Sequence, residues 1–260
     1  MTQVRAPHLR RCWLFVPAAE RDALAAASKT GADVLIQEFE DFCPPERRPE
    51  ARQMAPEVLQ AWRGAGLVAA VRINPLDGGP GQSEGLADLE AVMPGRPHVV
   101  ALPKVAEPEH IVALDREISR LEAALGIPEG TTELLPNLEY ARGLVQAQAI
   151  AAASPRVNAM LLASEDLVAD LGAERGRDGA ELAYARQRFL VECVAAGVVA
   201  VDCPYTFADT EGVKAETRWA RRMGYKAKSA VAPDHAAVVT RVLTPTQEEI
   251  EQARRIVAIF

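Results

Sequence analysis

Two short apolar stretches of this chain each end in carboxylates. Residues 134–138 are followed directly by Glu139, and residues 159–162 lead through two small residues to Glu165 and Asp166. Each stretch has the length and composition of a buried strand and precedes a helical pattern. Carboxylates at the same edge of two neighbouring strands could bind a hard divalent cation between them. Glu139 and Asp166 are therefore candidate metal ligands, provided that the fold brings the two strand ends together.

The order of apolar and amphipathic segments indicates that fold. The expected strands are residues 12–16, 34–39, 67–73, 99–102, 134–138, 159–162, 198–202 and 225–230. The expected helices are residues 20–30, 49–63, 107–125, 140–153, 181–196, 210–223 and 234–242, with a C-terminal helix at 246–260 that begins with the capping box Thr246-Gln-Glu-Glu249. No break in composition or linker separates these units. Eight strand–helix units predict a single-domain (β/α)8 TIM barrel over residues 1–260, with an open doubly wound sheet as the alternative.

The composition argues against several classes of function. The net charge is −7 at neutral pH, so neither a nucleic acid nor an anionic membrane surface is expected as a partner. No apolar run is long enough to span a bilayer, and the basic N-terminal residues lack the apolar segment of a secretory signal. The four cysteines have neither paired nor metal-binding spacing. We therefore expect reduced cysteines in a cytoplasmic protein.

Charged and polar residues follow most of the expected strands. In a (β/α)8 barrel the carboxyl ends of the strands meet at one mouth, where the active site lies. The residues expected there are Glu38, Glu40, Asp41, Arg72, Asn74, Lys104, Glu139, Glu165, Asp166, Asp202 and Lys228. The helix dipole would explain one such acid, but this many charges at one rim favour a binding site, since isolated buried charges are costly. The Gly- and Pro-rich loop at residues 75–85 is expected to shape this mouth or to act as a lid.

The residue types at the mouth favour magnesium chemistry. Glu139 and Asp166 offer only oxygen ligands, which favours Mg²⁺, with Mn²⁺ possible, over zinc. Two carboxylates leave coordination positions for water and for a chelating substrate such as a 2-oxo acid. Arg72 could bind the substrate carboxylate or stabilise an enolate. Lys104 is expected to bind substrate or phosphate or to form an ion pair, with a Schiff-base lysine as the less favoured alternative.

Six motifs occur in an order that is specific to one family. They are Trp13-Leu-Phe-Val-Pro17, Glu38-Phe-Glu-Asp41, Val71-Arg-Ile-Asn-Pro75, Leu102-Pro-Lys-Val105, Leu138-Glu-Tyr-Ala-Arg-Gly143 and Ser164-Glu-Asp-Leu167. With them the chain resembles the citrate lyase β-subunit-like branch of the HpcH/HpaI aldolase superfamily over nearly its whole length. The resemblance implies a TIM barrel, usually trimeric or hexameric, with a Mg²⁺ site for cleaving or forming carbon–carbon bonds. In many relatives the acyl group is carried by coenzyme A.

The resemblance also implies roles for individual residues. Glu139 and Asp166 match the metal ligands of the family, and Arg72 matches the residue that contacts the substrate oxygen and stabilises the enolate. Glu40 and Asp41 match the acids that hold metal-bound water or the arginine in place.

The chain departs from the family pattern at several positions. After the first expected strand, the usual Gly-Asp/Asn-Arg-Pro turn is Ala18-Ala19-Glu20-Arg21, in which only the arginine is kept. Arg21 is therefore expected, with Lys104, to contact the substrate. The threonine that usually follows the metal-binding glutamate is Tyr140, and the usual Ile-His-Pro is Val231-Ala232-Pro233.

Three functions are compatible with these residues. The first is a Mg²⁺-dependent carbon–carbon lyase that acts on a hydroxy acid or an acyl-CoA thioester through a metal-stabilised enolate. The second is a pyruvate-type class II aldolase that acts on free acids without coenzyme A. The third is a non-catalytic metal-binding subunit of a larger complex. Retention of Arg72, Glu139 and Asp166 together favours an enzyme, since a scaffold would have no need of all three.

Overall fold

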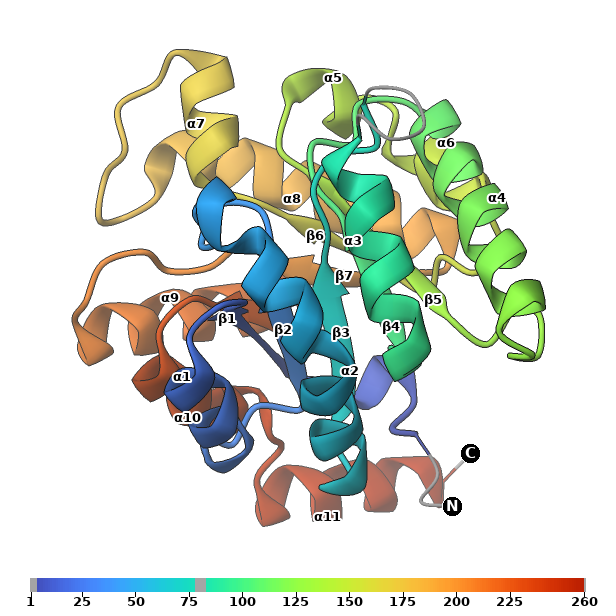
Figure 1. Cartoon of the computed structure of the whole chain (residues 1–260). Coiled ribbons are helices and arrows are strands. Elements are labelled where there is room, and N and C mark those ends of the chain that lie inside the picture. Colours follow the sequence, from blue (N-terminus) through green and yellow to red (C-terminus); the bar gives the residue numbers. More distant parts are fainter. Residues whose placement is uncertain (1–3, 78–82, 260) are drawn as a thin grey trace.

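The computed structural model describes residues 4–77 and 83–259, in which eight parallel strands close into a barrel surrounded by helices (Figure 1). The strands are β1 Cys12–Pro17, β2 Val34–Glu38, β3 Val68–Arg72, β4 Val99–Leu102, β5 Glu133–Leu138, β6 Ala159–Leu162, β7 Val199–Asp202 and β8 Ala227–Ala230. Each strand pairs with its successor in the sequence, and β1 pairs with β8 to close the barrel. The predicted (β/α)8 architecture is confirmed, and the open sheet is excluded.

Successive side chains of each strand alternate between the barrel interior and the surrounding helices. Trp13 and Phe15 of β1 and Leu135 of β5 belong to the interior cluster. Leu14 and Leu134 belong instead to the larger cluster that includes apolar side chains of the helices. Because both faces of the barrel wall are buried, the strands read as nearly continuous apolar runs, which is how they could be found in the sequence.

The helices cover the outside of the barrel. They are α1 Arg21–Ala26, α2 Arg48–Gly64, α3 Glu84–Val92, α4 Pro108–Ala124, α5 Ala141–Leu144, α6 Ala147–Ala152, α7 Glu165–Leu171, α8 Ala183–Ala196, α9 Thr210–Met223, α10 Pro233–Leu243 and α11 Gln247–Val257. Short 3-10 turns are η1 Pro7–Leu9, η2 Ala27–Lys29, η3 Pro45–Arg47, η4 Met93–Gly95 and η5 Ala180–Leu182. None of the helices within the described ranges combines the length and the apolar character that crossing a bilayer requires.

Helix α3 was not expected from the sequence, and the helix expected directly after the sixth strand, α7, had been given no bounds. Helix α3 starts at the N-cap Ser83, whose hydroxyl accepts a hydrogen bond from the Leu86 amide at 3.3 Å. Helix α7 is only seven residues long and ends at Gly172, which has a left-handed backbone. Both follow loops of the mouth, and both are short enough for the periodic signal to be weak. Of the expected loop at 75–85, residues 78–82 lie outside the described residues.

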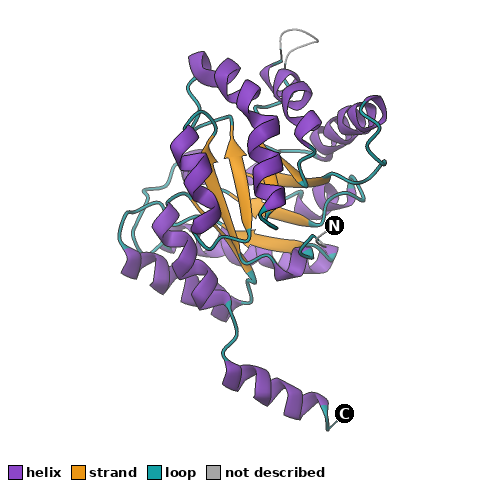
Figure 2. Ribbon diagram, turned by 60° about the horizontal axis from the view of Figure 1, so that its bottom comes forward, coloured by secondary structure: helices purple, strands orange, loops and turns teal. Residues whose placement is uncertain are grey.

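The C-terminal helix α11 projects away from the barrel (Figure 2). Its predicted capping box is present, because the Thr246 side chain and the Glu249 side chain each bond the other residue's backbone amide. No residue of α11 is buried. An ion pair of 2.8 Å between Glu249 and Arg221 connects α11 to α9. The apolar face of α11 is therefore not packed into the described part of its own barrel.

The strand alternation corrects one expectation about the mouth. Asp202 and Lys228 were expected there, but their neighbours Val201 and Ala227 already face the interior. Asp202 and Lys228 consequently point outward, and both are completely buried between the barrel and its helices. They belong to the packing of the barrel wall and not to the mouth.

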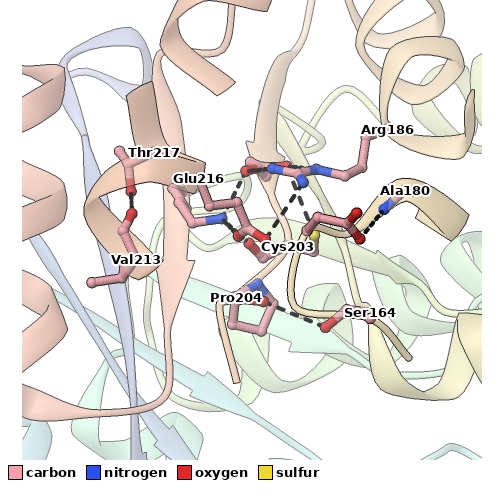
Figure 3. Close-up of polar contacts among 12 residues, drawn as sticks. Ser164, Ala180, Arg186, Cys203, Pro204, Val213, Glu216 and Thr217 are labelled. Atoms are coloured by element: carbon pink, nitrogen blue, oxygen red, sulfur yellow. Dashed lines mark hydrogen bonds and ion pairs between the residues drawn. The ribbon is translucent and has the colours of Figure 1, made fainter. Parts of the chain in front are cut away.

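These two residues form an ion-pair network with α8 and α9. Arg186 of α8 donates two hydrogen bonds to Asp202, at 2.8 and 2.6 Å. Lys228 Nζ donates to Asp202 Oδ2 at 2.8 Å and to Glu216 Oε1 of α9 at 2.7 Å. Figure 3 shows Arg186 and Glu216 reaching the network from opposite sides. The network thus joins β7 and β8 to two outer helices.

Replacing Lys228 with methionine is expected to destabilise the protein strongly. Asp202 and Glu216 would lose a shared cation in a buried site, and breaking such a buried pair costs about 3 kcal/mol or more. Urea denaturation of the wild type and Lys228→Met measures the change. The matched control is Arg221→Ala, which breaks a partly exposed pair worth about 1 kcal/mol or less. Equal stability losses in the two variants would contradict this account of the network.

Candidate active site

Arg72 lies at the centre of the mouth among four carboxylates. Its Nε donates to Glu38 Oε1 at 2.8 Å, and its Nη2 donates to Asp41 Oδ2 at 2.8 Å. Nη2 is also 3.3 Å from Glu40 Oε2, and Nη1 is 3.7 Å from Glu139 Oε1. Only 5% of Arg72 is exposed. The guanidinium is therefore held in one orientation by acids from the ends of β2 and β5.

The barrel register explains why Arg72 and Glu38 meet. The two residues are the last of β3 and β2 and are direct register partners, so their side chains emerge together. The Glu38 carboxylate also accepts hydrogen bonds from the backbone amides of Glu40 and Phe42. Glu38 thus fixes both Arg72 and the loop that carries Glu40 and Asp41. Sequence reasoning placed Glu38 at the rim but gave the task of holding Arg72 only to the other two acids.

Lys104 is ion-paired in the structure. It follows β4 with a left-handed backbone (φ 57°), and its Nζ donates to Glu40 Oε1. Burial alone would lower the pKa of Lys104, but the hydrogen bond and the charge of Glu40 raise it. Burial raises the pKa of Glu40, against the effect of Arg72 and Lys104. A nucleophilic lysine needs a lowered pKa, so these contacts favour the ion-paired role over a Schiff base.

Glu139 is a buried carboxylate without a hydrogen-bond partner. It has no exposed surface, and neither carboxylate oxygen is hydrogen-bonded by any described residue. Burial raises the pKa of Glu139 to about 8, and although Arg72 opposes this effect, Glu40 and Asp166 add to it. A buried carboxylate without hydrogen bonds is costly, and a divalent cation would reduce that cost. The two oxygens of Glu139 therefore fit a metal ligand.

Asp166 and its neighbour Glu165 differ in what their carboxylates contact. Glu165 Oε1 accepts from Ser164 at 3.2 Å, Arg175 at 3.1 Å and Thr206 at 2.8 Å. Asp166 lies in the first turn of α7 and lines the same cavity as Arg72. Glu165 Oε1 thus already accepts three hydrogen bonds from protein side chains. Asp166 is therefore the better candidate for a metal ligand, which is the residue that was proposed from the sequence.

Two protein ligands leave room for others on a cation at this site. In the described ranges, no group of three or more histidine, cysteine, aspartate or glutamate side chains is arranged to hold a metal. A cation bound by Glu139 and Asp166 would take its other ligands from water or substrate. Mg²⁺ usually binds in this way, through one or two carboxylates.

A cavity of about 300 Å³ opens between Arg72 and Asp166. Its polar wall consists of Asp41, Arg72, Ser164, Glu165, Asp166 and Thr206. Its apolar wall consists of Phe15, Phe42, Leu161, Ala163, Pro204 and Val231. The cavity therefore offers a charged side for a carboxylate-bearing ligand and an apolar side for carbon.

The remaining site candidates lie outside this cavity. Arg21 is exposed at the start of α1 and lines a separate hollow between α1 and α2 with Glu57 and Trp62. Lys104 lines a second hollow with Pro75 and His110. The substrate-binding roles of Arg21 and Lys104 stay predictions.

Asn74 holds the loop after β3. Its side-chain amide donates to the Phe39 carbonyl at 3.0 Å and to Asp88 of α3 at 2.8 Å. The backbone amide of Asn74 donates to the same Asp88 carboxylate. Both side-chain contacts face the protein, so Asn74 orders the mouth without contributing to the cavity wall.

The raised pKa of Glu139 predicts how stability depends on pH in the metal-free protein. The folded-state pKa of about 8 lies above the ordinary value of 4.5, so between these values the folded state retains a proton that the unfolded state loses. The free energy of unfolding therefore falls as pH rises from about 4.5 to 8, by an amount on the order of a few kcal/mol. Glu139→Gln removes the titrating carboxyl group, so its free energy of unfolding should not fall over this pH range.

Urea denaturation in EDTA at pH 5 and pH 8 compares the wild type with Glu139→Gln. The control is Glu165→Gln, which removes a carboxylate that is more than half exposed and should leave the pH dependence close to that of the wild type. Identical pH profiles for all three proteins would show that Glu139 is not the group responsible.

The chain is similar to known proteins in both sequence and structure. The family model for HpcH/HpaI aldolase/citrate lyase matches residues 11–233. The chain is 34% identical to the citrate lyase subunit beta of Escherichia coli (strain K12), over 98% of this chain and 83% of that protein. It is 30% identical to the L-malyl-CoA/beta-methylmalyl-CoA lyase of Rhodobacter capsulatus, over 99% of this chain and 86% of that protein. The crystal structure of CitE from Mycobacterium tuberculosis in complex with magnesium, acetoacetate and coenzyme A is similar, with a TM-score of 0.75 and 29% identity over 97% of this chain and 88% of that one.

Proposed function

Because the chain belongs to the HpcH/HpaI aldolase/citrate lyase family, we propose that it is a Mg²⁺-dependent carbon–carbon lyase of the citrate lyase β-like type. The observation that carries this proposal is the fully buried Glu139 carboxylate, which has no hydrogen-bond partner and lies 3.7 Å from Arg72, a residue that lines the same cavity as Asp166. A buried acid with a purely structural role would be expected to accept hydrogen bonds, whereas neither oxygen of Glu139 accepts one from a described residue. The relatives named above are lyases, and the M. tuberculosis structure holds magnesium.

Each residue of the mouth has a distinct role in this proposal. Glu139 and Asp166 hold the cation, for which Mn²⁺ is a possible substitute. When bound, the cation supplies Lewis-acid polarisation of a substrate oxygen. Arg72 Nη1 is too far from Glu139 for a strong hydrogen bond and is left to donate to the oxygen on which enolate charge develops. Glu40 and Asp41 orient Arg72, together with Glu38.

The proposed substrate is a hydroxy acid or its coenzyme A thioester. The polar wall of the cavity suits a carboxylate or 2-oxo group near the cation, and the apolar wall suits the carbon chain that is cleaved or joined. The R. capsulatus relative is named for coenzyme A thioesters, and the M. tuberculosis structure holds coenzyme A. Lys104 and Arg21 are proposed contacts for the more distant part of the substrate.

We further propose a homo-oligomer, a trimer or hexamer, in the cytoplasm. Helix α11 presents Ile250, Ala253 and Val257 along one side, over a shallow apolar hollow. An isolated helix of this length is marginal in water, so it needs a partner surface, which a second copy of the chain would provide. The four buried free cysteines suit a reducing compartment.

Mutation of the proposed ligands is expected to abolish the Mg²⁺-dependent response. Calorimetry with and without Mg²⁺ measures binding of acetyl-CoA, coenzyme A, pyruvate, oxaloacetate and glyoxylate, and turnover assays follow for any pair that binds. Glu139→Gln and Asp166→Asn should lower turnover by about two orders of magnitude or more, since each removes a charged ligand. Glu211→Gln, at an exposed position on α9, is the control.

The outcomes of this panel separate the candidate functions. Thioester binding with a Mg²⁺-dependent response to an oxo acid supports the acyl-CoA lyase. Oxo-acid binding without thioester binding supports the free-acid aldolase. Full activity of Glu139→Gln and Asp166→Asn would contradict the proposed metal site.

The proposed assembly predicts the effect of a charge placed on α11. Ile250→Glu puts a carboxylate into the apolar face and should lower the molar mass measured by light scattering. Gln252→Glu adds the same charge about 200° around the helix and should leave the mass unchanged. A monomeric wild type, or equal masses for both variants, would contradict a role of this face in assembly.

A further inference from the structure

Asn137 is a polar residue in the interior of the barrel, one step below Glu139. Leu135 of β5 belongs to the interior cluster, so the alternation of the strand places Asn137 and Glu139 on the same inner face. Asn137 is the register partner of Leu161 on β6, which lines the cavity of the mouth. Asn137 has no exposed surface. It therefore lies at the floor of the site.

The side chain of Asn137 has no hydrogen-bond partner among the described residues. Both Oδ1 and Nδ2 are buried without a hydrogen-bond partner, as are both oxygens of Glu139. Asn137 on β5 and Glu139 just after it thus carry four buried polar atoms without a hydrogen bond, next to the apolar cluster that fills the barrel interior. Buried amides of this kind are rare because each unpaired atom loses its hydration without compensation. An apolar side chain would suit this position better if packing alone mattered.

A water molecule between Asn137 and Glu139 would provide hydrogen bonds for both side chains. Asn137 and Glu139 lie on the same face of the strand, yet no hydrogen bond joins the amide directly to the carboxylate. A water molecule can bridge two polar groups that do not bond each other directly. Ala101 is the register partner of Leu135, and Ala70 and Ala159 also belong to the interior cluster. These small side chains fill less of the barrel interior than larger apolar residues would.

We propose that Asn137 is a positioning residue of the metal site: its amide holds a buried water molecule that donates a hydrogen bond to the inner oxygen of Glu139. The outer oxygen of Glu139 is then oriented toward the cation and Arg72. This inference rests on the proposed metal site, to which it adds the group that supports the ligand from below. Partners of this kind orient metal ligands in many sites, and their loss commonly weakens metal affinity by about 10- to 100-fold.

The test compares Asn137→Ala with Asn137→Ser, which differ by one hydroxyl group. Mg²⁺ affinity is measured by calorimetry, and the melting temperature is measured in EDTA. Asn137→Ala should weaken Mg²⁺ binding by about 10- to 100-fold without lowering the melting temperature of the metal-free protein. Asn137→Ser should retain most of the affinity, because its hydroxyl can bond the same water molecule. A role in packing alone would not separate the two variants.

Two controls distinguish failure of this inference from failure of the metal site. Gln37→Ala removes another buried amide, which donates to the Ala18 carbonyl, and should not change Mg²⁺ affinity. Glu139→Gln should abolish Mg²⁺ binding. Wild-type affinity in Asn137→Ala, or equal losses in the alanine and serine variants, overturns the role of Asn137 while the metal site stands. Wild-type affinity in Glu139→Gln overturns the metal site itself and the inference with it.

Discussion

The mouth of the barrel gathers more negative than positive charge, and its organisation depends on this excess. Arg72 is surrounded by Glu38, Glu40, Asp41 and Glu139, while Lys104 neutralises part of the charge of Glu40. Glu38 and Asp41 are satisfied by hydrogen bonds, but Glu139 is not. The folded chain therefore contains an acid whose ionised form is disfavoured by burial and would be stabilised by additional positive charge. That constraint connects the buried carboxylate, the fixed arginine and the expected cation.

Much of the fold was accessible from the sequence because a barrel wall buried on both faces leaves a clear signal. All eight strands were found within a few residues of their ends, since each is a short apolar run bounded by turns. The inner or outer direction of a strand's last residue was harder to predict. Asp202 and Glu139 look alike in the sequence, yet one faces α8 and the other faces the mouth. That distinction requires the register of each strand, which a continuous apolar run does not reveal.

In the candidate site, too, the residues could be predicted from the sequence, but their contacts with one another could not. Arg72, Glu40, Asp41, Glu139 and Asp166 could be named from residue types and motif order, and the structure brings them around one opening. The support that Glu38 provides depends on lateral pairing of β2 with β3, which is a property of the sheet and not of either segment. Arg21 follows β1 at the same rim, but it is exposed and lines a hollow between α1 and α2, not the cavity between Arg72 and Asp166. The position of a residue in the sequence predicts whether it lies at the rim of the barrel. The direction of its side chain has to be taken from the three-dimensional structure.

The pairing of β1 with β8 also bears on how the chain is made. Trp13 and Ser229 are register partners although more than two hundred residues separate them, so the seam of the barrel joins the start of the chain to its last strand. During synthesis, β1 emerges from the ribosome long before β8 and has no neighbour on that side. Until residue 230 is free, the nascent sheet has two open edges, and such edges can pair with other chains. Ring closure is thus a late event, and protection of the first strand depends on the last one.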